Sequence, residues 1–214
     1  MLKIIALAGS PRKGATEYIA QQALDYVKEV NPDIQTELIT LRGKDIKPCN
    51  GCGYCKRNKT WCILKDDMQE LFDKFIEADG YVVVSPVYIM GATPQLHAFL
   101  SRMRPAMHCF PGMLRSKFAA PVTVGGARNG GQEMANLDIV NMLVSRSINI
   151  VANEAGGFIG GKVWSKDNGA EGAAEDEIGM KTVRQQCMKL AEISMIYKMG
   201  KEAYEKEKAE SGNQ

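Results

Sequence analysis

The amino-acid sequence predicts an α/β protein built on a doubly wound parallel sheet. Short, nearly continuous apolar runs alternate with segments whose apolar residues recur at helical spacing. No linker or internal repeat interrupts this alternation. The 214 residues suit one domain with a full core, so we expect a single domain over residues 1–214 with right-handed crossovers between its strands.

Five segments are expected to form the strands. Residues 2–8 are an apolar run typical of a parallel strand that is buried on both faces. Residues 34–41 alternate in hydropathy, as a more exposed edge strand does. Similar apolar runs predict the remaining strands over residues 81–85, 119–124 and 148–152.

Helical periodicity predicts the segments between and after these strands. The expected helices cover about residues 19–27, 68–76, 94–103, 132–147 and 176–204, the last being a C-terminal extension from about residue 176. Thr93 and Pro94 predict the start of the third helix, as an N-cap followed by proline at the first helical position. A glycine-rich stretch, residues 153–173, precedes the last helix and contains Trp164.

Composition excludes several classes of protein. Charged residues are 24% of the chain and hydrophobic residues 45%, as in an ordinary globular domain. Lys and Arg number 27 against 25 Asp and Glu, so no strong field attracts nucleic acid or acidic lipid. No apolar run approaches the roughly 18 residues of a membrane span, and the N-terminal run is too short for a signal peptide. We therefore expect a cytoplasmic protein with neither nucleic acid nor membrane as partner.

The loop after the first predicted strand favours an anion. Loop 9–16 reads Gly-Ser-Pro-Arg-Lys-Gly-Ala-Thr and precedes a helix. Its hydroxyls and cations, with the free N–H groups of the helix start, indicate a phosphate site. Because the loop matches neither the Walker pattern nor Gly-x-Gly-x-x-Gly, an ordinary helix start with a tight turn is the alternative.

The loops after the third and fourth strands favour a flat ligand. Loop 85–93 carries apolar and aromatic side chains that cannot all pack inward from so short a turn. Loop 125–133 has four glycines in nine residues, which lets the main chain approach a ring closely. The alternative for loop 85–93 is a hydrophobic loop that covers the next helix. The alternative for loop 125–133 is a flexible turn. All three loops belong to one sheet edge, and together they predict a mononucleotide, as in flavodoxin-like sheets that bind FMN.

Four of the six cysteines lie in one segment, the cysteine loop (residues 47–64). Their spacing is Cys49-x2-Cys52-x2-Cys55-x6-Cys62. Three thiolates at every third position and a fourth after a gap can each bind one iron of a cubane cluster. Tetrathiolate zinc more often uses two pairs joined by a longer spacer, and disulfides are typical of small secreted chains. We therefore expect an iron–sulfur cluster, with zinc, disulfides or free thiols as alternatives.

The remaining cysteines and both histidines are not expected to be catalytic. Cys187 falls on the apolar stripe of the last helix, which predicts a core position, and Cys109 has no partner motif. His97 and His108 are interpreted as a helix surface residue and a loop residue. Since the sequence offers no Ser-His-Asp or paired-carboxylate arrangement, cofactors are expected to supply the chemistry.

These motifs resemble a known family. The three loops are similar to those of the NADPH-dependent FMN reductase branch of the flavodoxin-like fold, over about residues 1–152. With the cysteine loop added, the chain resembles the iron–sulfur flavoproteins of anaerobic archaea and bacteria. The resemblance implies a five-stranded parallel sheet of order 2-1-3-4-5 with helices on both faces. It also implies a homodimer or homotetramer with the flavin site near a subunit boundary. The glycine-rich stretch 153–173 is interpreted as part of that subunit contact or as a mobile surface loop.

The resemblance further implies roles for individual residues. The implied phosphate contacts are Ser10, Arg12, Lys13, Gly14 and Thr16, whereas Ala15 stands where many relatives have a small polar residue. The implied contacts with the ribityl chain and the ring are Pro86, Val87, Tyr88 and Gly91, and on the other side of the ring Gly125, Gly126, Gly131 and Gln132. The implied ligands of a [4Fe–4S] cluster are Cys49, Cys52, Cys55 and Cys62.

The expected function is that of a flavin-dependent oxidoreductase in which FMN exchanges two electrons and the cluster passes them singly. The resemblance implies ferredoxin or NAD(P)H as donor and a small molecule as acceptor. Because the cysteine loop and loop 9–16 both flank the first two strands, the cluster and the flavin ring are expected to be close enough for direct electron transfer. The alternatives are an NAD(P)H-dependent FMN or quinone reductase with structural zinc, a non-catalytic redox carrier, and a dehydrogenase for a biosynthetic intermediate.

Overall fold

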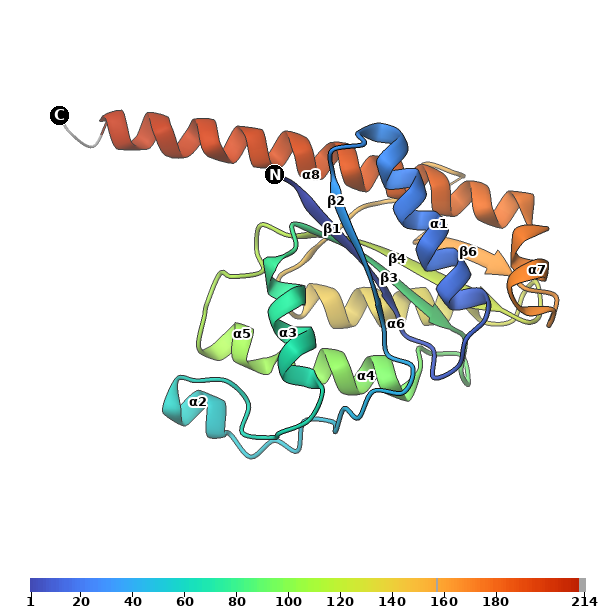
Figure 1. The fold of residues 1–214 in the computed structure, drawn as a ribbon, viewed down its shortest axis with the longest axis horizontal. Coiled ribbons are helices and arrows are strands. Elements are labelled where there is room, and N and C mark those ends of the chain that lie inside the picture. Colours follow the sequence, from blue (N-terminus) through green and yellow to red (C-terminus); the bar gives the residue numbers. More distant parts are fainter. Residues whose placement is uncertain (157, 212–214) are drawn as a thin grey trace.

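A parallel sheet lies at the centre of the computed structural model, which describes residues 1–156 and 158–211 (Figure 1). Its strands are β1 (Lys3–Ala8), β2 (Gln35–Thr40), β3 (Gly80–Pro86), β4 (Phe118–Gly125), β5 (Asn149–Ile150) and β6 (Gly161–Trp164). Their order is β2-β1-β3-β4-β5, and β6 also pairs with β4. This confirms the predicted order 2-1-3-4-5. Gly157, within the glycine-rich stretch, and the chain end from residue 212 lie outside the described residues.

The fifth strand is split, where the sequence predicts one strand over residues 148–152. β5 pairs with the start of β4 and β6 pairs with its end. On this side of β4, the carbonyls of Ala119 and Gly125 accept hydrogen bonds from the backbone N–H groups of Val151 and Ser165. Pro121 belongs to the same alternating series and has no N–H to donate, so the ladder is interrupted there.

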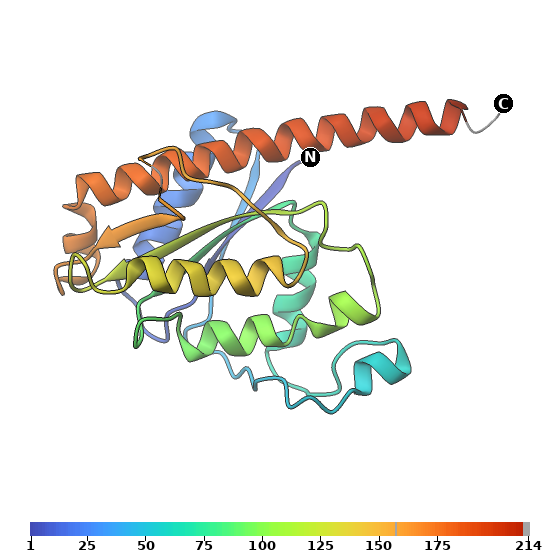
Figure 2. The ribbon, with the colours of Figure 1, turned by 180° about the vertical axis from the view of Figure 1, so that it is seen from behind.

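Helices cover both faces of the sheet (Figure 1, Figure 2). On one face lie α1 (Ala15–Val30) and α8 (Glu177–Ser211), and on the other α3 (Met68–Glu77), α4 (Pro94–Ser101) and α6 (Gln132–Val144). The alternation of β1 explains the two layers, because successive side chains of a strand point to opposite faces. Ile4 and Ala6 belong to the core beneath α1 and α8, whereas Ile5 and Leu7 belong to the core beneath α3, α4 and α6.

Three short helices complete the chain: α2 (Tyr54–Asn58), α5 (Arg104–His108) and α7 (Gly169–Ala174). The helix predicted over residues 94–103 ends at Ser101, and Pro105 lies in the first turn of α5. The last helix begins near the predicted residue 176 but continues past residue 204 to Ser211. Its C-terminal part extends beyond the sheet (Figure 1). Among the helices of the described residues, none has both the length and the apolar character that crossing a membrane requires.

Candidate functional site

The carboxyl ends of β1, β3 and β4 meet at one edge of the sheet, and their loops enclose a cleft of about 320 Å³. The cleft brings together most of the predicted cofactor contacts, namely Ser10, Arg12, Lys13, Gly14, Thr16, Pro86, Val87, Tyr88 and Gly126. Four others, Gly91, Gly125, Gly131 and Gln132, lie in the same loops but outside the lining of the cleft.

Loop 9–16 leaves the start of α1 open to the cleft. The Ser10 hydroxyl donates to the carbonyl of Arg12 at 2.8 Å, so this side chain shapes the loop. Gly14 is the N-cap residue, and it has no side chain that could cap the helix. The N–H groups of the first turn therefore add their partial positive charge to the charges of Arg12 and Lys13. Together these groups form the donor set that a phosphate requires.

A carboxylate in the first turn of α1 is neutralised. Glu17 accepts hydrogen bonds from Arg42 at 2.8 Å and from the Thr40 hydroxyl at 3.0 Å. Burial raises the pKa of Glu17, but the hydrogen bonds from Arg42 and Thr40 outweigh burial and hold the pKa below its ordinary value. Because Arg42 balances this negative charge, Glu17 does not oppose an anion in loop 9–16.

Loop 85–93 contains a strained apolar turn. The backbone N–H of Tyr88 donates to the Gly91 carbonyl and that of Gly91 donates to the Tyr88 carbonyl, both at 2.9 Å. Between them, Ile89 and Met90 have φ angles of 47° and 64°. A β-branched residue in this region is a genuine outlier, and such strain costs on the order of 1–3 kcal/mol. Ile89 is 100% exposed, next to the cleft residue Tyr88, so this strain places an apolar side chain beside the cleft.

Asp138 of α6 anchors the same turn, a role that no pattern in the sequence indicates. Its Oδ2 accepts the backbone N–H of Ala92 at 2.9 Å and lies 2.8 Å from Nε2 of His97. His97, expected as a surface residue of a helix, is half-exposed on α4 and paired with this carboxylate. The position of loop 85–93 therefore depends on α6 as well as on β3.

Loop 125–133 lies against the turn of loop 85–93. Gly131 has a φ of 95°, and a Cβ atom there would lie 2.6 Å from Sδ of Met90. The Gln132 side chain is buried and used within its own loop: its Nε2 donates to the Ala127 carbonyl at 2.7 Å and its Oε1 accepts the Gly130 N–H at 2.8 Å. Gln132 thus fixes the shape of the loop, and Gly131 permits the close contact.

The segment after β6 forms one wall of the cleft, which sequence reasoning missed. Ser165, Asp167 and Gly169 line the cleft. The Trp164 indole N–H donates to the Gly126 carbonyl at 2.7 Å, and a Cβ atom on Gly126 would overlap the Asp167 carboxylate. The only local pattern that could have indicated this strand is the Gly-Lys-Val-Trp run of residues 161–164. In the structure its residues alternate between buried and half-buried positions. It is only four residues long and lies in the glycine-rich stretch.

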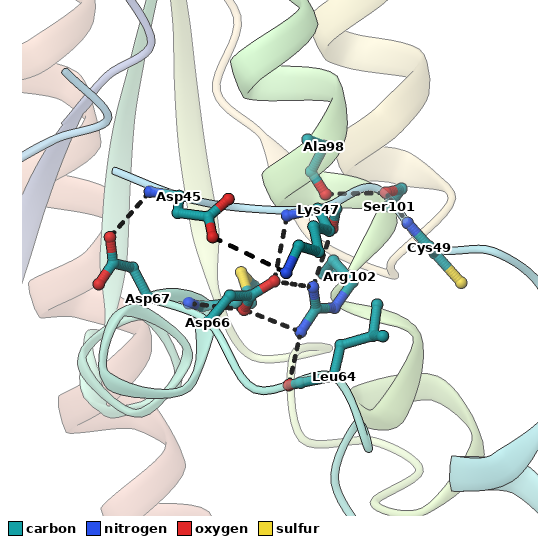
Figure 3. Close-up of polar contacts among 10 residues, drawn as sticks. Asp45, Lys47, Cys49, Leu64, Asp66, Asp67, Ala98, Ser101 and Arg102 are labelled. Atoms are coloured by element: carbon teal, nitrogen blue, oxygen red, sulfur yellow. Dashed lines mark hydrogen bonds and ion pairs between the residues drawn. The ribbon is translucent and has the colours of Figure 1, made fainter. Parts of the chain in front are cut away.

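At the base of the cysteine loop, a buried ion pair joins the two ends of the loop (Figure 3). Arg102 follows α4 in the chain. Its guanidinium donates to the carbonyl of Lys47 at 2.8 Å and to that of Leu64 at 3.3 Å. It also contacts the Asp66 carboxylate, at 2.6 Å for the closest pair of atoms. Residues on both sides of the four cysteines are therefore held by one side chain.

The thiols of the cysteine loop differ in exposure. Cys52 is exposed, Cys49 and Cys62 are half-buried and Cys55 is buried, and burial raises the pKa of the Cys55 thiol. All six cysteines of the chain have free thiols. In the described part of the chain, no group of three or more His, Cys, Asp or Glu side chains converges tightly enough to hold a metal ion. The four predicted ligands thus share a loop without forming a closed site.

The two other cysteines have distinct environments. Cys187 is fully buried in the core beneath α1 and α8, as predicted, and burial raises the pKa of its thiol. Cys109, for which the sequence predicts no role, lies against the cysteine loop. Its thiol contacts the carbonyls of Cys55 and Thr60 at 3.0 Å and 3.2 Å. A fifth thiol therefore supports the loop from outside the motif.

Helix α4 lies between the cleft and the cysteine loop. At its start, the Thr93 hydroxyl donates to the Gly9 carbonyl of loop 9–16, and the same oxygen accepts the Leu96 N–H, which confirms the predicted N-cap. At its end, the Ser101 hydroxyl accepts the Cys49 N–H at 3.1 Å (Figure 3). Eight helical residues span about 12 Å. The loops that carry the two predicted cofactor sites are therefore attached to opposite ends of α4.

Comparison with known proteins places this geometry in a family. Residues 2–155 match the family described as NADPH-dependent FMN reductase. An iron–sulfur flavoprotein of Methanocaldococcus jannaschii is 34% identical over 193 residues, covering 90% of this chain and 96% of the relative. An iron–sulfur flavoprotein of Archaeoglobus fulgidus is 36% identical over 191 residues, covering 89% and 96%. The chain belongs to the iron–sulfur flavoproteins of the NADPH-dependent FMN reductase family.

Solved structures confirm the flavodoxin-like fold of this iron–sulfur flavoprotein. RosB with a bound riboflavin-phosphate intermediate superposes with a TM-score of 0.70 at 16% identity, over 99% of this chain and 88% of RosB. A flavone reductase gives 0.65 at 19% identity, over 91% of this chain and 63% of its own. As a member of its family, the protein is a flavin-dependent oxidoreductase.

The residues present fit both groups that the family implies. The cleft volume lies within the range of cofactor sites, and the cleft combines two cations with the apolar residues Pro86, Val87 and Tyr88. At the cysteine loop, the donor set is four thiols. Two buried Nε–H groups beside it, on Arg104 and Arg146, have no acceptor among the described residues. Buried N–H groups of this kind require an acceptor, and an anionic cluster supplies one.

Proposed function

We propose that this flavoprotein binds FMN in the cleft and a [4Fe–4S] cluster in the cysteine loop, and transfers electrons between ferredoxin or NAD(P)H and a small acceptor. One observation carries the proposal: an anion-binding loop, an apolar turn and a glycine-rich loop converge on one cleft, while four thiols lie in one loop at the other end of α4. A flavin in the cleft would not explain the four clustered thiols, and a cluster in the cysteine loop would not explain the cleft.

The phosphate end of the cleft is formed by Arg12, Lys13 and the start of α1. These groups bind the phosphate and thereby fix the position of the rest of the cofactor. Pro86, Val87 and Tyr88 provide an apolar surface for the ring. Gly126 brings the main chain to the cleft without a side chain in the way, next to the carboxylate of Asp167.

The cysteine loop supplies the ligands Cys49, Cys52, Cys55 and Cys62. FMN exchanges electrons in pairs and a [4Fe–4S] cluster exchanges them singly, so the two groups together connect two-electron and one-electron partners. Arg102 holds the ends of the loop in place, and Ser101 fixes the backbone of Cys49 at the end of α4.

Association of two or four copies is part of this proposal. The C-terminal half of α8 exposes Ile196, Tyr197, Met199 and Tyr204. Near the cleft, Ile89 and Met90 are also exposed. Apolar side chains gathered on one helix are typical of an interaction surface, which favours a homodimer or a homotetramer.

Analysis of the protein purified without oxygen tests the proposal. We expect one flavin per chain together with about four iron and four sulfide, and visible absorbance beyond that of flavin that bleaches with dithionite. One flavin with zinc and no iron would instead support a flavin or quinone reductase with a structural metal. Absence of flavin would contradict the assignment of the cleft.

A further inference from the structure

A surface cavity of about 340 Å³ lies beside Cys49, on the side of the cysteine loop that faces α5 and the end of α6. Arg104 from the start of α5 and Arg146 from just after α6 both line it, together with His108. The cavity therefore places two guanidinium groups next to a proposed cluster ligand, from elements outside the cysteine motif.

Neither arginine has a carboxylate partner in the described ranges. Arg146 donates to Sδ of Met107 at 3.0 Å and to the Leu100 carbonyl at 3.4 Å, both neutral acceptors. The Nε–H groups of Arg104 and Arg146 are buried and have no acceptor among the residues that the structure describes. A buried, charged donor without an acceptor is costly, so this arrangement calls for an anion in the cavity region.

Arg102 provides an internal comparison. Its Nε–H is also buried without an acceptor, but its terminal nitrogens contact Asp66, so its charge is already balanced within the protein. Arg104 and Arg146 have no such balance. Of the three arginines beside the cysteine loop whose Nε–H is buried without an acceptor among the described residues, Arg104 and Arg146 therefore lack the carboxylate partner that Arg102 has.

We propose that Arg104 and Arg146 are positioning residues for the cluster, whose negative charge they balance and whose sulfur atoms they supply with N–H donors. This rests on the proposed function, because it requires a cluster in the cysteine loop. Net charge and hydrogen bonds to sulfur set the reduction potential of such clusters. Since reduction adds one negative charge, two nearby cations stabilise the reduced form and raise the potential.

The test is a redox titration of the oxygen-free holoprotein, with the reduced cluster followed by electron paramagnetic resonance. The variants are Arg104→Gln, Arg146→Gln, the double glutamine variant, and Arg104→Lys and Arg146→Lys, which keep the charge but lose the Nε–H. Arg184→Gln is the matched control, because Arg184 pairs with Glu29 on the opposite face of the sheet. Iron and flavin per chain are measured for every variant.

We expect each glutamine variant to have a more negative midpoint potential, with the largest shift in the double variant. The lysine variants fall between these and the wild type, and Arg184→Gln keeps the wild-type value. Loss of iron from the glutamine variants with iron kept in the lysine variants also supports the role. A double glutamine variant with full iron and the wild-type potential overturns it, as does equal loss of iron from the lysine variants. A wild-type protein without iron contradicts the proposed function itself.

Discussion

Arg102 and Asp66 form an ion pair in the interior, with a closest contact of 2.6 Å and side chains that are 1% and 0% exposed. Arg102 also binds the carbonyls of Lys47 and Leu64, which precede and follow the four clustered cysteines (Figure 3). A charged pair this deeply buried depends on additional hydrogen bonds, and the two carbonyls accept them from the terminal nitrogens of Arg102. The end of α4 thereby determines the positions of both ends of the cysteine loop.

Removal of Arg102 should destabilise the protein strongly. Arg102→Met leaves Asp66 buried without a counterion, and we expect the free energy of unfolding to fall by about 3–5 kcal/mol, measured by urea unfolding. The control is Lys74→Met, which breaks exposed pairs with Glu37 and Glu70 and should cost less than about 1 kcal/mol. Equal effects of the two substitutions would contradict a structural role for the buried pair.

The same pair predicts a pH dependence. Burial raises the pKa of Asp66, but hydrogen bonds from Arg102 and from the N–H groups of Lys47 and Met68 outweigh burial and hold the pKa below its ordinary value of 3.8. The unfolded chain therefore takes up this proton first as the pH falls. The contribution of Asp66 to stability is complete above the ordinary value and is lost as the pH falls through the lowered one.

Urea midpoints measured from about pH 7 to about pH 3 test this sign. The wild type should lose stability more steeply than Asp66→Asn below about pH 4, because the variant has no carboxyl to protonate. Asp45→Asn, which changes an exposed carboxylate near the same loop, is the control and should keep the wild-type slope. Parallel curves for the wild type and Asp66→Asn would show that the pair does not shift this titration.

Local patterns were sufficient to predict most of the sheet but not its edge. The runs that became β1, β3 and β4 are apolar on both faces, so their burial and order follow from the sequence. The break between β5 and β6 cannot be predicted from the sequence in this way. It depends on which neighbouring strand lies on the side of Pro121 where other residues would donate an N–H. That side is decided only when the strands pair.

The candidate site shows the same division. Loops 9–16 and 85–93 were predicted to share a cleft because they follow buried parallel strands. Arg102 and Asp66 are 36 residues apart, and neither position is unusual within its own segment. Cys109 reaches the cysteine loop only because α5 packs against α2. Partners of this kind are determined by tertiary packing and leave no local signal.

Cys55 and Cys109 provide a matched pair of thiols, one within the motif and one outside it. Cys55→Ser should abolish or greatly reduce bound iron, because it removes a proposed ligand. Cys109→Ser should retain iron, because a serine hydroxyl can replace the thiol that contacts the carbonyls of Cys55 and Thr60. Both are measured as iron and flavin per chain after oxygen-free purification. If Cys55→Ser retains as much iron as Cys109→Ser and the wild type, Cys55 is not a ligand of the cluster.

Substitution of Gly131 should weaken FMN binding, because Gly131 lies against loop 85–93. Gly131→Ala combines a strained φ of 95° with a Cβ that would lie 2.6 Å from Sδ and 3.3 Å from Cα of Met90, so the backbone of the turn that follows Tyr88 must shift as well as the Met90 side chain. Gly43→Ala is the control: its φ of 72° is also strained, but among the described residues no atom beyond its two chain neighbours lies within 4 Å of the added Cβ. We expect similar losses of stability, of about 1–3 kcal/mol, but weaker FMN binding in Gly131→Ala alone. Fluorescence titration of the apoprotein with FMN compares the two.

The anion site of loop 9–16 makes the last prediction, because FMN and riboflavin differ only in the phosphate. If Arg12 binds that phosphate, Arg12→Gln should weaken FMN binding about tenfold, or roughly 1.4 kcal/mol, and leave riboflavin binding unchanged. Lys28→Gln removes the same charge from the last turn of α1, far from the cleft, and should change neither affinity. Since Arg12 is exposed, the preference for FMN should also fall as salt is added. Equal losses for FMN and riboflavin in Arg12→Gln would show that the residue acts on the loop and not on the phosphate.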